Sequence, residues 1–236
     1  HTRENETAAD RMAFNFMKNT GYDCHAIKTS LELLDKIDDS LLFKPLALQQ
    51  AFHFNEYPFK KKWIQKESSI FSQMDENDSP LTRKEKDSLK THPDCSKRIS
   101  LLNDSIQQVL TGQKFLVNEA MFKQLKKEFF VEMTEQCYRE KNLSRNLYYS
   151  LLLLQANENT PVAVYSIARG LNRIYEYQKN HQLGSKIDKE SKNYPEEYNQ
   201  LLRMLGQLRL DELADLNYHF CHQHLPLMKE YSDFNE

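Results

Sequence analysis

Residues that interrupt helices are scarce in this chain. Only 5 glycines and 7 prolines occur among 236 residues, whereas Leu, Lys, Glu, Gln and Asn are plentiful. Straight side chains lose little conformational freedom in a helix, and few helix breakers stand between them. The composition therefore predicts an all-α fold, with at most a short hairpin in residues 40–75.

Charge, hydropathy and cysteine spacing exclude several classes of protein. The formal net charge is −2, without the basic excess that favours nucleic-acid binding. The longest apolar run, Leu151–Leu154, is far shorter than the ~20 residues of a membrane-spanning helix, and no signal peptide is visible. No cysteine belongs to a CxxC pair, so we expect four reduced and mostly buried thiols: Cys24, Cys95, Cys137 and Cys221.

Hydrophobic periodicity predicts three helices in the first half of the chain. The first ends at Gly21, a residue suited to terminating a helix. The second follows the capping residue Asp23, and the third follows Asp94. The second helix is expected to bury Ile27, Leu31, Leu34 and Ile37, and the third Ile99, Leu102, Ile106 and Val109.

The second half is typical of helical hairpins. We expect helices at about 118–141, 143–156, 160–181 and 195–224, the third opening at Thr160-Pro161. The pattern resembles tetratricopeptide-type helix pairs, without a clear 34-residue self-similarity.

Two acids lie within the apolar stripe of the first helix. Glu6 and Asp10 are one helical turn apart, and by spacing they share a face with Ala9, Ala13, Phe16 and Met17. A buried carboxylate is costly without a cation, a metal or strong hydrogen-bond donors. The alternative is that both acids lie near solvent at the helix end, where they would favour the helix dipole.

Two motifs, in order, resemble a known family. The run TRENETAAD at residues 2–10 resembles the S/T-R-x-x-E-x-x-A-D segment of HtpX, the CAAX prenyl protease and related gluzincin metallopeptidases. The run GYD at residues 21–23 is similar to a turn of their periplasmic and mitochondrial branches, and residues 91–99 resemble their THPxxxxRI segment. The resemblance covers residues 1 to about 110. It implies that residues 1–110 are the end of a zinc metallopeptidase catalytic domain. The hairpin pattern of the second half predicts a separate helical-hairpin domain at 111–236.

The resemblance implies roles for individual residues. Glu6 corresponds to the third zinc ligand, and Asp10 to a carboxylate that orients a zinc-bound histidine of HExxH. His92 would lie near the cleft, where it contacts substrate or occupies the open zinc position as a latch; alternatively it caps a backbone group. Arg98 pairs with a buried acid such as Asp10, or with a surface acid that contributes little.

The sequence contains no HExxH, so two zinc ligands and the general base are missing. We expect an upstream HExxH segment of the same chain as partner and zinc in the full-length enzyme. This chain alone should be inactive and bind zinc weakly or not at all. The expected parent is a zinc metalloendopeptidase of the bacterial inner membrane or envelope that cleaves a protein or peptide substrate, and the present piece is expected to be soluble. Lone thiols favour the cytoplasmic side and the GYD turn favours the periplasm.

Three other features carry weaker hypotheses. The cluster His219, Cys221, His222 and His224 is expected to be structural, with a metal clip as the alternative. The run Lys60-Lys61-Lys62 is expected to be solvated, with an anionic lipid surface as the alternative. Finally, residues 118–224 are a candidate scaffold for binding a protein partner, with no catalytic role for the first part of the chain.

Overall fold

The computed structural model describes residues 2–38, 45–66, 95–109, 111–158, 160–191 and 194–228. All regular elements in these ranges are helices, and the one β contact they contain is an isolated bridge between Tyr22 and Gln113. The predicted all-α class is confirmed. The chain divides into two compact units, one of His1–Leu42 with Ser68–Phe122 and one of Phe43–Glu67 with Lys123–Glu236.

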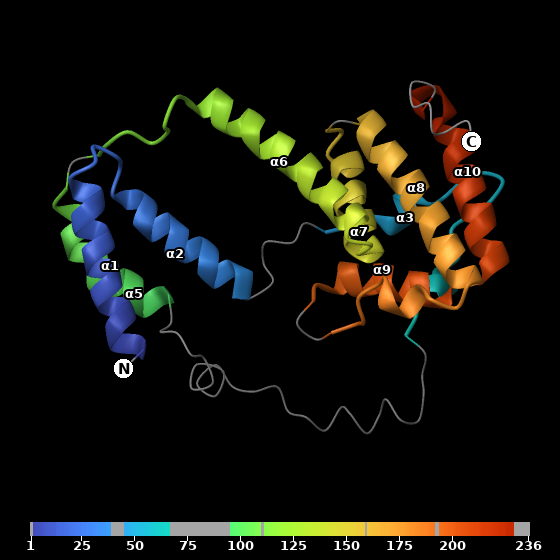
Figure 1. Cartoon of the computed structure of the whole chain (residues 1–236), viewed down its shortest axis with the longest axis horizontal. Helices are drawn as coiled ribbons and strands as arrows, with labels where there is room; N and C mark the ends of the chain where they lie inside the picture. Colours follow the sequence, from blue (N-terminus) through green and yellow to red (C-terminus); the bar gives the residue numbers. More distant parts are fainter. Residues whose placement is uncertain are drawn as a thin grey trace. The chain divides into compact units, whose positions relative to one another are not determined.

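The first unit is built on three helices, drawn in blue and green in Figure 1: α1 (Thr2–Lys18), α2 (His25–Asp38) and α5 (Cys95–Gln107). Both α1 and α2 contact α5. Their small core contains the buried side chains of Phe14, Cys24, Leu31, Leu102 and Ile106. The predicted inward face of α5 is confirmed, since Ile99 and Val109 pack on this core. The predicted face of α2 is partly wrong, because Leu34 is 49% exposed, and the side chain of Ile37 lies outside the described residues.

The turn between α1 and α2 is held by its backbone and by a later segment. Gly21 has φ +77°, which suits a residue without a Cβ and agrees with its predicted role as a helix stop. Gln113 N donates to Gly21 O at 2.9 Å, and Gln113 O accepts from Asp23 N at 3.0 Å. Gly112 fits beside this turn because a Cβ there would lie 2.5 Å from Gly21 O.

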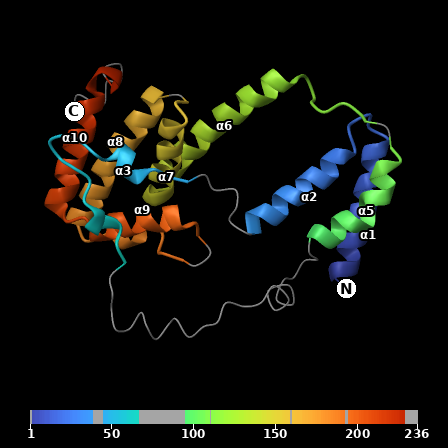
Figure 2. The same cartoon turned by 180° about the vertical axis from the view of Figure 1, so that it is seen from behind.

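The second unit contains a larger core, and Figures 1 and 2 show the helices that form it. The helices α7 (Leu143–Gln155) and α8 (Thr160–Lys179) form a hairpin, and α10 (Leu210–Met228) packs on α8. Residues 45–66 supply α3 (Leu48–Ala51) and the 3₁₀ turn η1 (Lys61–Ile64), which contacts α9 (Glu196–Gln207). A 3₁₀ turn, η3 (Leu183–Ser185), follows α8, and α6 (Glu119–Arg139) precedes the hairpin. No strand of the hairpin allowed for residues 40–75 occurs in the described residues 45–66.

One predicted helix of this unit is wrong. Residues 195–224 were expected to be continuous, but α9 ends at Gln207 and α10 begins at Leu210. Between them Leu208 is extended, with φ −62° and ψ 124°, and only 1% exposed. Its carbonyl accepts a hydrogen bond from Gln178 Nε2 at 2.7 Å. The burial of Leu208 and its hydrogen bond to α8 arise from tertiary packing, so the break in the helix could not be predicted from the local sequence.

Candidate functional site

Glu6 and Asp10 lie on the face of α1 that turns away from solvent. Their side chains are 22% and 14% exposed. Further along the same face, Phe14 is buried and Met17 packs on the core of the first unit. The acids therefore lie at the edge of an apolar stripe, where a carboxylate requires a cation or strong hydrogen-bond donors.

The predicted apolar neighbours of these acids are largely wrong. Ala9, Ala13 and Phe16 are exposed, Phe16 to 72%. Ala9 and Ala13 precede Asp10 and Phe14, respectively, by one residue, about 100° of rotation, and Phe16 follows Phe14 by two residues, about 200°. The contact of α1 with α5 selects the side that carries Phe14, and spacing within one helix does not reveal where its neighbour packs.

Arg98 on α5 is the cation that faces both acids. Its Nε and Nη2 atoms each donate to one oxygen of Asp10, at 2.7 Å in both cases, and Nη1 lies 3.7 Å from Glu6 Oε2. The guanidinium is 18% exposed, and its hydrogen bonds to Asp10 raise the pKa of Arg98. Of the two pairings considered from sequence, the structure contains the one with Asp10. Two parallel N–H···O bonds make this a strong and geometrically specific ion pair.

The described residues do not complete a metal site around this pair. No group of three His, Cys, Asp or Glu side chains in the described ranges is arranged to hold a metal ion. Glu6 and Asp10 carry carboxylate oxygens, which zinc accepts as ligands, and their roles as zinc ligand and supporting carboxylate stay predictions. His92 lies outside the described residues, so its predicted role stays a prediction.

A second acid–base pair, which the sequence reasoning did not single out, lies at the start of α2. Asp23 is 6% exposed and accepts from His25 N at 3.0 Å, which confirms its capping role. His25 Nδ1 lies 2.7 Å from Asp23 Oδ1, and this hydrogen bond lowers the pKa of Asp23. The pair borders a cavity of about 430 Å³. The signal available in the sequence was the spacing Asp-x-His at a helix N-terminus.

The C-terminal histidines contact aromatic rings, and His219 and His222 share a contact with Tyr218. His219 stacks on Tyr57 at 5.3 Å between ring centroids, and His224 lies 4.6 Å from the ring of Phe220. His222 is 6.0 Å from Tyr218 on the exposed side of α10. These contacts agree with the structural interpretation of the cluster. Cys221 and the other three cysteines are free thiols, as predicted, but of the four Cys24 alone is fully buried.

The basic run of residues 60–62 is less solvated than expected. Lys60 Nζ and Lys62 Nζ lie 3.0 and 2.9 Å from Glu212 Oε1, whose side chain is only 5% exposed. Lys60 also lies over the rings of Tyr57 and Trp63. The expectation of three simply solvated lysines is wrong for Lys60 and Lys62, because the buried glutamate on α10 requires cations.

In the described part of the first unit, two inward acids lie one turn apart on α1 and face an arginine from α5. The sequence model of Peptidase family M48 matches residues 1–106. This match supports a zinc metallopeptidase kind of function for that part of the chain. Comparisons with curated proteins and with solved structures give no match.

Among the described helices, none has the length and hydropathy that a bilayer span requires.

Proposed function

We propose that residues 1–110 are the carboxylate-bearing part of a zinc metalloendopeptidase of the HtpX and CAAX prenyl protease type, with Glu6 as the third zinc ligand. The observation that carries this proposal is the placement of Glu6 and Asp10, inward and one turn apart, within the segment that matches Peptidase family M48. The substrate class is a protein or peptide. The parent enzyme is associated with a membrane, in the bacterial inner membrane or envelope.

Glu6 and Asp10 have complementary tasks in this proposal. Glu6 would ligate zinc through a carboxylate oxygen, and bound zinc supplies Lewis acidity towards water and a peptide carbonyl. Asp10 would accept a hydrogen bond from a ligand imidazole and so fix its tautomer. The bonds from Arg98 do not prevent this, because an ionised carboxylate has about four acceptor positions and Arg98 uses two.

Arg98 is then a positioning residue. It fixes the rotamer of Asp10 through two bonds and reduces the repulsion between two carboxylates on one helical turn. His92 is proposed to lie at the cleft, in contact with substrate or as a latch on the open zinc position.

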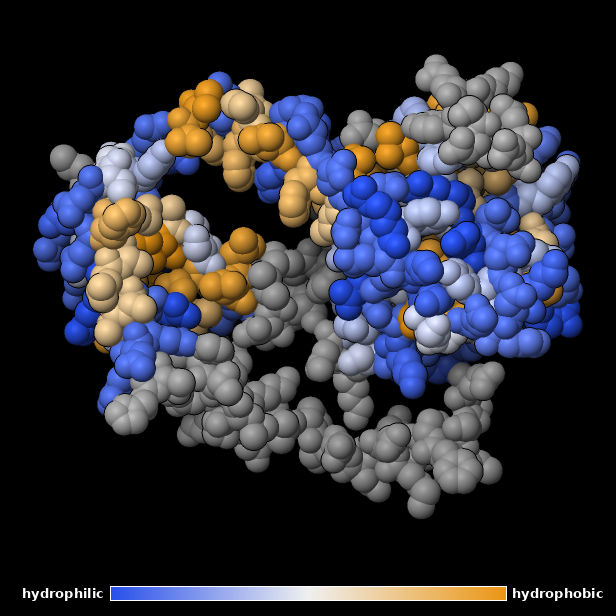
Figure 3. Space-filling model, in the orientation of Figure 1, coloured by the Kyte–Doolittle hydropathy of each residue, from blue (hydrophilic) through white to orange (hydrophobic). Residues whose placement is uncertain are grey.

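The missing HExxH segment is the proposed partner of the first unit. Large apolar side chains are exposed on all three of its helices, and Figure 3 shows hydrophobic surface gathered over them. They are Met12 and Phe16 on α1, Leu33 and Leu34 on α2, and Leu101 on α5, each at least 49% exposed. Their burial against an HExxH-bearing segment would add to a core that holds five buried side chains in the described part.

The decisive variant is Glu6→Gln in a protein that joins this chain to an HExxH helix. A neutral amide is a poor zinc ligand, so cleavage of a casein substrate should fall by at least ~100-fold, the largest loss typical for residues that only support a metal ligand. Bound zinc, measured by mass spectrometry, should fall as well. Glu4→Gln is the matched control, because Glu4 lies on the exposed side of α1. Unchanged cleavage by the Glu6 variant would remove this residue from the site.

The chain by itself provides a second measurement. With one ligand supplied by Glu6 and no HExxH, we expect no peptidase activity and only weak zinc binding in a calorimetric titration. One tightly held zinc per chain would contradict the proposal that the ligand set is shared with another segment.

An alternative candidate is a protein-binding scaffold formed by residues 118–224. The larger second unit contains most of these residues, and its helical hairpin and its own core favour this role. Both functions are compatible in one protein if the second unit presents substrates to the first.

A further inference from the structure

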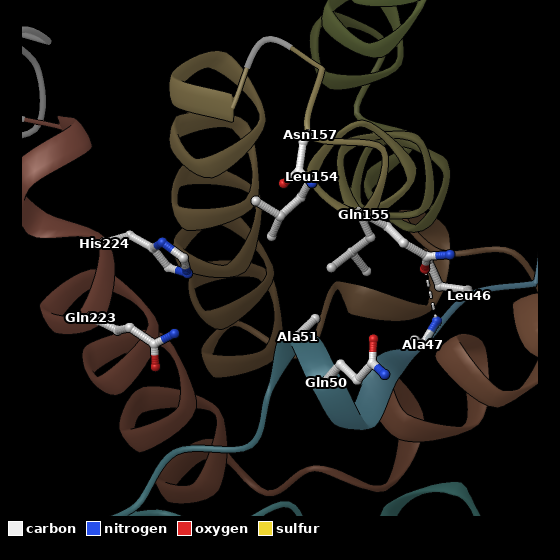
Figure 4. A pocket seen from close by; sticks show the side chains of 10 residues that line it. Leu46, Ala47, Gln50, Ala51, Leu154, Gln155, Asn157, Gln223 and His224 are labelled. Atoms are coloured by element: carbon white, nitrogen blue, oxygen red, sulfur yellow. Dashed lines mark hydrogen bonds between the residues drawn. The ribbon is translucent and has the colours of Figure 1, made fainter.

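The second unit contains a cavity of about 290 Å³ between α3, the end of α7 and the end of α10. Figure 4 shows its residues facing one another across this space: Ala51 and Gln50 come from α3, Leu154 from α7, and Gln223 and His224 from α10. The volume would accommodate one or two amino-acid residues.

One wall of the cavity is fixed by hydrogen bonds. The Gln155 side chain accepts from Ala47 N at 3.1 Å and donates to the Pro45 carbonyl at 3.0 Å. These bonds hold the segment before α3 against the end of α7 (dashed line in Figure 4 for the bond to Ala47). The opening is therefore defined by ordered backbone on that side.

The described lining residues carry apolar and neutral polar groups. Leu46, Ala51, Leu151 and Leu154 provide an aliphatic surface, and none of the residues around the cavity is an Asp, Glu, Lys or Arg. Burial lowers the pKa of His224, so its imidazole is predominantly neutral at pH 7. A charged ligand would lose hydration on entry and find no counter-charge among these residues.

Two carboxamides at the cavity are available to a ligand. The side chains of Gln50 and Gln223 make no hydrogen bond to other described residues and are solvent-exposed at the rim. A carboxamide presents both a donor and an acceptor, which matches the donor and acceptor of a peptide main chain. An aliphatic surface beside two such groups suits a ligand that combines a hydrocarbon side chain with amide groups.

We propose that this cavity binds an uncharged peptide segment, with an aliphatic side chain against Leu151 and Leu154 and main-chain amides hydrogen-bonded by Gln50 and Gln223. The site lies entirely within the second unit and does not depend on zinc or on the proposed peptidase function. It assigns the second unit a recognition chemistry for neutral, aliphatic polypeptide.

The test uses the chain of residues 1–236 and three blocked pentapeptides, acetyl-Ala-Ala-Leu-Ala-Ala-amide and its versions with Asp or Lys in place of Leu. Titrations are followed by NMR of the glutamine side-chain amides. We expect the Leu peptide to bind weakly and shift the Gln50 and Gln223 signals, with no saturable shift from the charged peptides. No binding of the Leu peptide, or equal binding of all three, would overturn the proposal.

Matched variants test the site itself. Gln50→Ala and Gln223→Ala each remove one hydrogen-bonding group and should weaken binding about five-fold. Asn172→Ala removes an exposed carboxamide from α8, outside the cavity lining, and should leave binding unchanged. Both glutamines are exposed at the surface, so the fold should tolerate their loss. Equal affinity of all three variants would show that the peptide binds elsewhere and would refute the assignment.

Discussion

Two carboxylates shielded from solvent in the described part of the chain pair with cations from distant parts of the sequence. Arg98 bonds both oxygens of Asp10, 88 positions away, and Lys60 reaches Glu212 across 152 positions. In each case the acid lies on a helix face that also buries apolar side chains. Removal of Arg98, or of Lys60 and Lys62 together, would leave a carboxylate with reduced hydration and without its cations, which is more costly than loss of an exposed pair.

The ion pairs of Glu212 predict how the stability of the fold depends on pH. Burial by itself would raise the pKa of Glu212, but hydrogen bonds from Lys62 and Lys60 outweigh burial and lower the pKa from 4.5 to about 2. The folded state therefore gains stability from ionised Glu212 above pH ~4.5, and loses it as the pH falls towards about 2. After allowance for screening of the two lysines, which are 39% and 60% exposed, the contribution at pH 7 is about 2 kcal/mol.

The measurement is urea unfolding of wild type and Glu212→Gln, followed by the fluorescence of Trp63, the one tryptophan of the chain. The variant should be less stable at pH 7, and the difference should shrink between pH 4.5 and 2. The control is Asp211→Asn, whose pair with Arg209 is exposed on both sides and should contribute little. A difference that does not change with pH would show that the carboxylate is not held ionised.

At the scale of helices, the close packing of α7 on α8 decides which positions can carry a side chain larger than that of glycine. Gly170 on α8 faces α7, and a Cβ there would lie 2.8 Å from Asn146 Oδ1 and 3.2 Å from Leu147 Cδ2. Asn146 cannot move freely, since its Nδ2 donates to Thr134 O and to Ser166 Oγ, both at 3.0 Å. The buried hydrogen bonds and the small residue together set the spacing of the hairpin.

Two glycine substitutions should therefore have opposite signs. Gly170→Ala should destabilise the second unit by about 1–3 kcal/mol, because overpacking outweighs the better helix propensity of alanine. Gly206→Ala, in α9 with no atom within 4 Å of an added Cβ, should stabilise it by about 0.5–1 kcal/mol. Thermal unfolding of both variants checks the pair, and stabilisation by Gly170→Ala would contradict the close packing of α7 on α8.

At the scale of the whole molecule, the two units differ in the size of their cores. In the described residues, the first core contains 5 buried hydrophobic side chains and the second contains 25. Burial of apolar surface is the main source of stability, so the first unit should unfold at lower denaturant concentration.

The prediction is a two-phase unfolding curve by circular dichroism, with Trp63 fluorescence reporting the later phase, since Trp63 belongs to the second core. Phe14→Ala should shift the early phase alone and lower the free energy of unfolding of the first unit by about 3–5 kcal/mol. Leu171→Ala should shift the late phase alone and lower that of the second unit by about 2–5 kcal/mol. Coincident transitions by both probes would show that the units unfold together.

Composition predicted the helical class, and patterns along the sequence predicted the burying face of α5 and the stop at Gly21. Spacing gave an inward face for Glu6 and Asp10 as one of two alternatives. These features depend on residues three or four positions apart, or on the backbone of a single residue. The sequence offered Asp10 as one of two kinds of partner for Arg98 but could not choose between them. It did not reveal that Phe14 rather than Phe16 is buried, that the helix predicted at 195–224 is interrupted at Leu208, or that Lys60 and Lys62 pair with Glu212. Each of these depends on which distant helix packs on a given face. Which helices meet is determined by the packing of the whole unit. The local sequence around a side chain therefore does not specify the residue that it contacts on another helix.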